Sequence, residues 1–205
     1  SSRNKESRNT RLFKESKKRL AALIAWGDVK FGMSMKEVLA TETFKGGKKY
    51  DDSIAMEFSR EQNFKKAFGL ENPSGVWAEF KDKELYRIYI KSKYLTASRI
   101  DDLVKDCDIF IKKFTEKYGA PSYKNSKIDI SEFNPEENFV YAKFQIGDKM
   151  IAIELGELRS DVRFYYHIYI DNSKFPKKKH VMTEKEKREE QKQKEETEKI
   201  RNNSF

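Results

Sequence analysis

The stretch VRFYYHIYI, residues 162–170, alternates side-chain character more strictly than any other part of the 205-residue chain. Because successive side chains of a strand point to opposite faces, this spacing predicts a β-strand with two different faces. One face carries Val162, Phe164, Tyr166, Ile168 and Ile170. The other carries Arg163, Tyr165, His167 and Tyr169. A fold that contains this strand therefore needs a core on one side and leaves three rings on the other.

Two further strands are predicted directly before it, at residues 139–146 and 149–155, with Gly147 and Asp148 as a two-residue turn between them. This turn pairs, on the core face, Phe144 with Ile151, Ala142 with Ile153 and Val140 with Leu155. The opposite face of this hairpin then continues the aromatic face of residues 162–170. The outer surface predicted in this way comprises Tyr141, Lys143, Arg163, Tyr165, His167 and Tyr169.

Residues 99–118 show the clearest helical pattern, with Ser98 as the predicted N-cap, Gly119 at the C-terminal end and Pro121 blocking continuation. One stripe at helical spacing comprises Ile100, Leu103, Val104, Cys107, Phe110, Ile111, Phe114 and Tyr118. Cys107, the single cysteine, lies within this stripe. We therefore expect a small buried side chain at this position rather than a reactive thiol.

The rest of the fold is predicted from shorter patterns. Ser34 and Glu37 form a capping-box pair that starts a helix at residues 35–41, and a hairpin is expected at residues 76–80 and 85–90. A helix from about Leu12 is expected to dock only by its end, near Trp26. The predicted fold is α+β: an antiparallel sheet of about five strands with one long amphipathic helix on one face, N-terminal helices and a charged C-terminal tail.

Charge divides the chain into a basic arm at residues 1–25, one domain at 26–175 and a charged helical or disordered tail at 176–205. The net charge is +9, and residues 1–19 hold eight basic against two acidic side chains. Such an arm favours nucleic acid or an anionic membrane surface as a partner. Its cations are Arg3, Lys5, Arg8, Arg11, Lys14, Lys17, Lys18 and Arg19. No run of 18 apolar residues is present, so no membrane-spanning helix is expected.

Converging catalytic or metal-binding groups are not apparent in the sequence. The only histidines are His167 and His180, which leaves almost no material for a histidine metal site or a serine–histidine triad. The glycines and lysine of FKGGKK, residues 44–49, lack the spacing of a phosphate-binding loop. We therefore predict a protein that is not an enzyme and that has neither a cofactor nor a metal.

Three stretches together resemble a known kind of domain: WGDVKFGMSMKEV, then ELYRIYI before the long helix, then KYGAPS after it. The chain resembles, over about residues 26–172, small bacterial α+β domains of the beta-lactamase-inhibitor-protein-like and SmpA-like type. The resemblance implies a non-catalytic domain of an envelope lipoprotein or of a secreted or phage-related protein, in which an exposed sheet face or loops bind another protein.

The predicted function is protein binding or scaffolding through the tyrosine-rich outer surface, because tyrosine and arginine are the side chains that most often anchor interfaces. The alternative is nucleic-acid binding through the basic arm. A start such as SSRNKES suits the polar tether of a processed lipoprotein, which slightly favours the cell envelope as the location.

Overall fold

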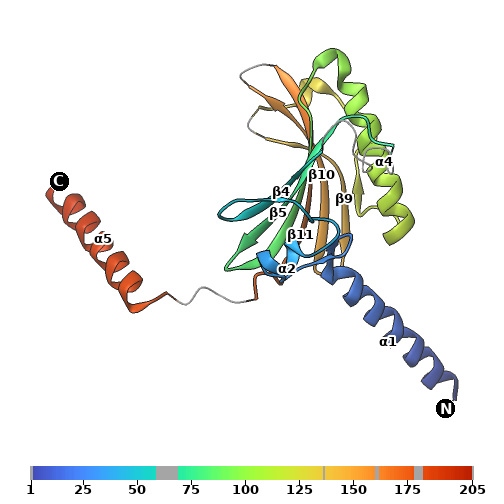
Figure 1. The fold of residues 1–205 in the computed structure, drawn as a ribbon, viewed down its shortest axis with the longest axis horizontal. Helices are drawn as coiled ribbons and strands as arrows, with labels where there is room; N and C mark the ends of the chain where they lie inside the picture. Colours follow the sequence, from blue (N-terminus) through green and yellow to red (C-terminus); the bar gives the residue numbers. More distant parts are fainter. Residues whose placement is uncertain (1, 59–68, 136, 160–161, 178–181, 205) are drawn as a thin grey trace.

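Figure 1 shows a large antiparallel sheet with one long helix, α4, across one of its faces. This computed structural model describes residues 2–58, 69–135, 137–159, 162–177 and 182–204, and of residues 2–6 the backbone alone. The predicted α+β class is confirmed, together with the antiparallel sheet and the helix packed on it. Among the described residues, no helix combines the length and the apolar composition that crossing a membrane requires.

The main sheet has nine strands, so the prediction of about five strands is too low. In spatial order its strands are β3 (Lys48–Lys49), β4 (Ser53–Glu57), β5 (Pro73–Lys81), β6 (Glu84–Ser92), β11 (Arg163–Asn172), β10 (Lys149–Leu158), β9 (Phe139–Ile146) and β8 (Tyr123–Lys124), while β7 (Leu95–Thr96) pairs with β11. A separate two-stranded hairpin consists of β1 (Ile24–Trp26) and β2 (Val29–Lys30). The predicted strands form the centre of the sheet, the additional strands β3, β4 and β8 lie toward its edges, and β7 pairs with the start of β11.

The helices are α1 (Ser2–Leu23), α2 (Met35–Leu39), α4 (Ile100–Tyr118) and α5 (Glu184–Asn203), with 3-10 turns η1 (Ala97–Arg99) and η2 (Ile130–Glu132). The capping box at α2 is confirmed, because the Ser34 side chain accepts from the Glu37 amide while the Glu37 carboxylate accepts from the Ser34 amide. Ser98 is not the cap of α4, since η1 precedes that helix and Arg99 takes the N-cap position. Within the C-terminal tail, Glu184–Asn203 forms the helix α5.

The core lies between α4 and the sheet face beneath it. Six of the eight residues of the predicted apolar stripe of α4 are buried, and Val104 and Tyr118 are partly buried. Cys107 lies within the stripe with no exposed surface. Phe110 packs edge-on against Tyr166 of β11 at a centroid distance of 6.0 Å, and Phe114 packs against Phe144 of β9 at 5.7 Å. Burial raises the pKa of the Cys107 thiol well above its ordinary value, so this side chain behaves as a small apolar residue.

A β-bulge between β9 and β10 changes the predicted facing of Tyr141. The turn at residues 147–148 pairs Phe144 with Ile151 and Ala142 with Ile153 as predicted, but the register then shifts by one residue. Phe139 rather than Val140 therefore lies opposite Leu155. Tyr141, the extra residue, turns toward α4, where it is 7% exposed and its hydroxyl donates to Asp108 at 2.6 Å. Its predicted place on the outer surface is wrong, because the bulge reverses the alternation.

A second correction concerns the start of residues 162–170. Phe164, Tyr166, Ile168 and Ile170 are buried as predicted. Val162 instead lies before β11, has a positive φ of 50° and is 61% exposed. It belongs to the connection between β10 and β11 rather than to the core.

The end of α1 is fixed to the sheet by two buried polar side chains, Lys149 and Asn172, and the Asn172 side chain donates to the Ala22 carbonyl at 2.8 Å. Lys149 has no exposed surface, and its ammonium donates to the carbonyls of Ala21 at 2.7 Å and Ile24 at 3.0 Å and to the hydroxyl of Tyr118 at 2.9 Å. Burial, with the nearby Lys117, lowers the pKa of Lys149 to about 8. The N-terminal helix contacts the sheet at its C-terminal end, near Trp26, but it begins at Ser2 and not at about Leu12 as predicted. The rest of α1 projects away from the sheet (Figure 1).

Candidate binding surfaces

Three neighbouring strands bring aromatic side chains to the outer face of the sheet, the face opposite α4. The register places Trp77 of β5 beside Tyr89 of β6, and Tyr89 beside Tyr169 of β11. Their ring centroids are 5.7 Å apart in the first pair and 5.1 Å apart in the second, which is stacked. The ring centroid of His167 lies 4.9 Å from that of Tyr89 and 4.2 Å from that of Tyr165. We name the following six residues the ring cluster: Trp77, Tyr89, Tyr94, Tyr165, His167 and Tyr169.

One end of the ring cluster depends on a glycine. Tyr94 packs edge-on against Tyr165 at a centroid distance of 5.6 Å. The Tyr165 ring lies across Gly156 of β10, where any Cβ atom would overlap it. The Tyr165 hydroxyl donates to the Asn138 side chain at 3.1 Å. Backbone and side-chain contacts thus hold this ring in a defined position.

His167 lies between two tyrosine hydroxyl groups at the centre of the ring cluster. Its Nε2 atom is 2.6 Å from the Tyr89 hydroxyl, and its Nδ1 atom is 3.2 Å from the Tyr169 hydroxyl. Desolvation, assisted by the charge of Lys91, lowers the pKa of His167 to about 3. The imidazole is therefore neutral at physiological pH and acts as part of the aromatic surface rather than as a cation.

The lowered pKa of His167 predicts an acid-sensitive contribution to stability. Because its pKa lies below the ordinary value of 6.5, the unfolded chain binds the proton more tightly, and stability is lost as the pH falls from about 6.5 towards 3. Between pH 7 and pH 4, we expect the free energy of unfolding of His167→Gln to fall by about 2 kcal/mol less than that of the original chain. Urea denaturation of both proteins at the two pH values measures this difference. An identical pH dependence for the two proteins would contradict the assigned environment.

Charged side chains border the ring cluster and are themselves held in place. Arg87 donates to both carboxylate oxygens of Asp171, at 2.7 and 3.0 Å, and its guanidinium lies 4.8 Å from the centre of the Tyr169 ring. Lys91 lies 4.4 Å from the centre of the Tyr94 ring. Most of these pairs join neighbouring strands, so they fix the rotamers of the outer face before any partner arrives.

The residues predicted for this surface are only partly brought together. Tyr165, His167 and Tyr169 lie in the ring cluster, whereas Tyr141 lies on the α4 side of the sheet. Lys143 shares the outer face with Tyr169 but is separated from it by Ala152. The exposed Arg163 begins β11 two residues before Tyr165. Trp77, Tyr89 and Tyr94 were not among the residues predicted for this surface, although the alternation within the β5–β6 hairpin indicates the facing of the first two.

No described helix covers the ring cluster. Tyr166 and Ile168 alternate with His167 and Tyr169 along β11 and point toward α4, so α4 occupies the opposite face. Helix α1 contacts β1 and β9 and accepts a hydrogen bond from Lys149 of β10, on the α4 side of the sheet, and α2 contacts β4. In the described part of the chain five of the six rings are therefore half-buried among their neighbours on the sheet, and Tyr94 is exposed.

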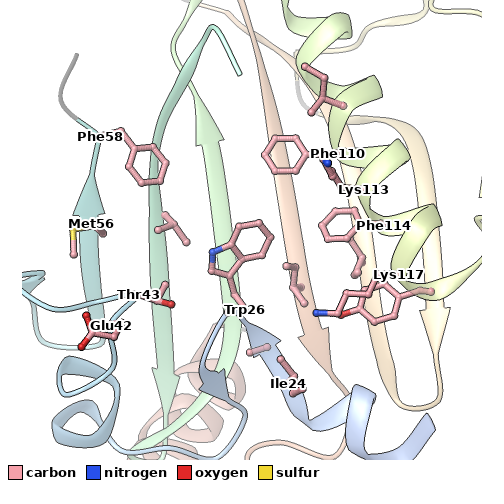
Figure 2. Close-up of a pocket in the computed structure, with 17 residues that line it drawn as sticks. Ile24, Trp26, Glu42, Thr43, Met56, Phe58, Phe110, Lys113, Phe114 and Lys117 are labelled. Atoms are coloured by element: carbon pink, nitrogen blue, oxygen red, sulfur yellow. The ribbon is translucent and has the colours of Figure 1, made fainter. Parts of the chain in front are cut away.

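A separate apolar groove lies on the α4 side of the sheet, with a volume of about 760 Å³ (Figure 2). Its apolar walls include Trp26, Met56, Phe58, Phe110, Phe114 and Ile170. Lys113 and Lys117 of α4 line it on one side and Glu42 on the other. Phe58, which lines the groove, is the last described residue before residue 69.

Neither surface presents a catalytic constellation among the described residues. The described lining of the groove contains no histidine, cysteine or aspartate, and His167 is saturated by its two tyrosines. No group of three or more His, Cys, Asp or Glu side chains suited to a metal ion occurs within the described ranges. His180 and the side chains of Arg3 and Lys5 lie outside the described residues.

Comparisons with known proteins return no match, whether with protein-family models, curated proteins or solved structures. The resemblance to the beta-lactamase-inhibitor-protein-like and SmpA-like domains therefore stays a prediction. Any argument about function has to begin from the two surfaces themselves.

Proposed function

We propose that this chain is a non-catalytic protein-binding module and that the ring cluster is its binding surface. The observation that carries the proposal is the contiguity of six rings on a sheet face that no described element covers. Large apolar surface with a polar rim on a monomer is typical of a site for another macromolecule. The resemblance noted from the sequence implies the same class of function.

The chemistry of the ring cluster favours a protein over a nucleic acid. Tyrosine and tryptophan provide large contact areas at low entropic cost, and Arg87 borders them as a further anchor of the type found in protein interfaces. Arg87 is, however, held by Asp171 and lies 3.9 Å from the Glu79 carboxylate. These two acidic side chains repel phosphates, which a nucleic-acid surface would have to attract.

Site-specific photo-crosslinking tests the proposal. A photoreactive phenylalanine analogue replaces Tyr94 or Tyr165 within the ring cluster, and Tyr50 or Tyr123 serves as a matched exposed control outside it. We expect one protein to be crosslinked from the two ring-cluster positions and from neither control. Crosslinks to the same protein from all four positions, or from the controls alone, would sink the proposal.

A further inference from the structure

Helix α1 has an exposed apolar face that the proposed function does not use. Four large side chains are solvent-exposed along it: Leu12 (52%), Phe13 (61%), Leu20 (64%) and Leu23 (40%). At 3.6 residues per turn they fall within an arc of about 100°, together with the small polar residues Asn9 and Ser16. The helix is fixed only at its C-terminal end, so this face has no partner within the described residues.

The remaining circumference of α1 is strongly basic. Between residues 7 and 23 there are six cations and one acidic residue, Glu15, which gives a net charge of +5. Arg8 and Arg19 flank the apolar arc on the side of Leu12. Lys17 flanks it on the other side, with its ammonium 4.6 Å from the centre of the Phe13 ring. An apolar arc between two rows of cations is the pattern of a helix that lies in a membrane interface.

We propose that α1 binds the surface of an anionic lipid bilayer, with Leu12, Phe13, Leu20 and Leu23 inserted and the cations at the headgroups. Two features exclude other occupants on physical grounds. A second copy of α1 would bring a charge of +5 against another +5. Helix α5 carries seven cations and seven anions between residues 184 and 203, so its net charge is zero and does not complement that of α1. Phosphate contacts alone would give no role to four exposed apolar side chains.

Both the basic face and the apolar face of α1 contribute to the affinity for the bilayer. A lysine or arginine near an anionic surface contributes about fivefold in affinity, and this contribution is screened by salt. Insertion of the apolar side chains adds a contribution that salt does not screen. The sheet would then be tethered to the bilayer through α1, whose C-terminal end is joined to β10 by Lys149. The ring cluster would stay free on the outer face of the sheet.

Vesicle cosedimentation of the full chain tests this inference. We expect binding to phosphatidylcholine vesicles that contain phosphatidylglycerol to be at least about tenfold tighter than to phosphatidylcholine alone. Phe13→Ser with Leu20→Ser should weaken it about tenfold with the charge unchanged, and Arg8→Glu with Arg19→Glu, which reverses the cations that flank the arc, should do so with the apolar face unchanged. The matched controls are Ile200→Ser and Lys185→Glu with Lys192→Glu on α5, which should bind as the original chain does. Circular dichroism checks that every variant keeps its folded domain.

Three results would overturn the inference. The first is equal binding to neutral and anionic vesicles, or binding that the two α1 variants leave unchanged. The second is tighter binding to an oligonucleotide that Phe13→Ser with Leu20→Ser does not affect, which would assign α1 to nucleic acid. The third is a dimer in the absence of vesicles that the same substitution dissociates, which would assign the apolar arc to a second copy of the chain.

Discussion

Replacing Asp106 with alanine is expected to lower the free energy of unfolding by about 3–5 kcal/mol. The Asp106 side chain is fully buried on α4 and accepts three hydrogen bonds. Its donors are the amides of Glu71 at 2.9 Å and Asn72 at 3.0 Å and the hydroxyl of Tyr166 at 3.0 Å. Alanine would leave these donors without an acceptor in the interior, which costs more than the net value of the bonds themselves.

The burial of Asp106 also explains why asparagine should be tolerated better. Desolvation raises the pKa of its carboxyl group above the ordinary value although the three donors act in the opposite direction. Asp106→Asn keeps one acceptor oxygen and removes the buried charge. We therefore expect its denaturation midpoint to lie between those of the original chain and of Asp106→Ala. Lys112→Ala, at an exposed position of α4, is the control and should change stability by less than about 0.5 kcal/mol. Chemical denaturation measures all three, and equal midpoints for Asp106→Ala and Lys112→Ala would contradict this assignment.

Removing three rings at the edge of the ring cluster is expected to lower affinity for the protein partner by at least about 100-fold. The substitutions are Tyr94→Ser, Tyr165→Ser and Tyr169→Ser together. They leave Trp77, Tyr89 and the core face intact, so the domain should stay folded. Tyr141 is deliberately excluded from this set, because its hydroxyl binds Asp108 on the α4 side and its loss would change stability rather than binding.

Isothermal titration calorimetry with the partner protein identified by crosslinking measures this loss of affinity. The control carries Tyr50→Ser and Tyr123→Ser, which remove two exposed rings outside the ring cluster, and it should bind as tightly as the original chain. A second variant, Lys91→Glu, reverses a charge beside Tyr94 without removing any ring and should weaken binding as well. A triple variant that binds like its control would show that the partner uses another surface.

Local patterns predicted the centre of this fold well. The two-residue turn at 147–148 and the alternation along β11 require neighbouring residues only, and both are observed. The stripe of α4 likewise follows from helical spacing within one segment. Such patterns predict which face of an element each side chain occupies. These predictions are correct except at the bulge, which contains Tyr141, and in the connection before β11, which contains Val162.

Tyr141 and Asp106 show where local patterns are insufficient. A bulge adds one residue to β9, and nothing in the spacing of residues 139–146 marks its position. Asp106 lies three residues after Leu103 and four before Phe110, within the apolar stripe of α4. A polar residue at such a core position indicates a buried acceptor, but its donors on Glu71 and Asn72 are distant in sequence.

The ring cluster could be predicted only in part because its assembly is non-local. Tyr165, His167 and Tyr169 belong to one strand, and their common face follows from alternation. Tyr89 joins them because β6 pairs with β11, which lies about 80 residues later along the chain. The sequence of either strand alone does not specify that pairing, so the densest part of the surface is visible only in three dimensions.

Hydroxyl-radical footprinting with and without the partner tests the protein-binding role of the ring cluster most directly. Oxidation of Tyr94, Tyr165 and Tyr169 is read by mass spectrometry, with Tyr50 and Tyr123 as internal controls in the same sample. We predict several-fold protection of the three ring-cluster tyrosines in the complex and unchanged oxidation of the two controls. Unchanged oxidation of Tyr94, Tyr165 and Tyr169 at saturating partner would contradict the proposal that this face binds it.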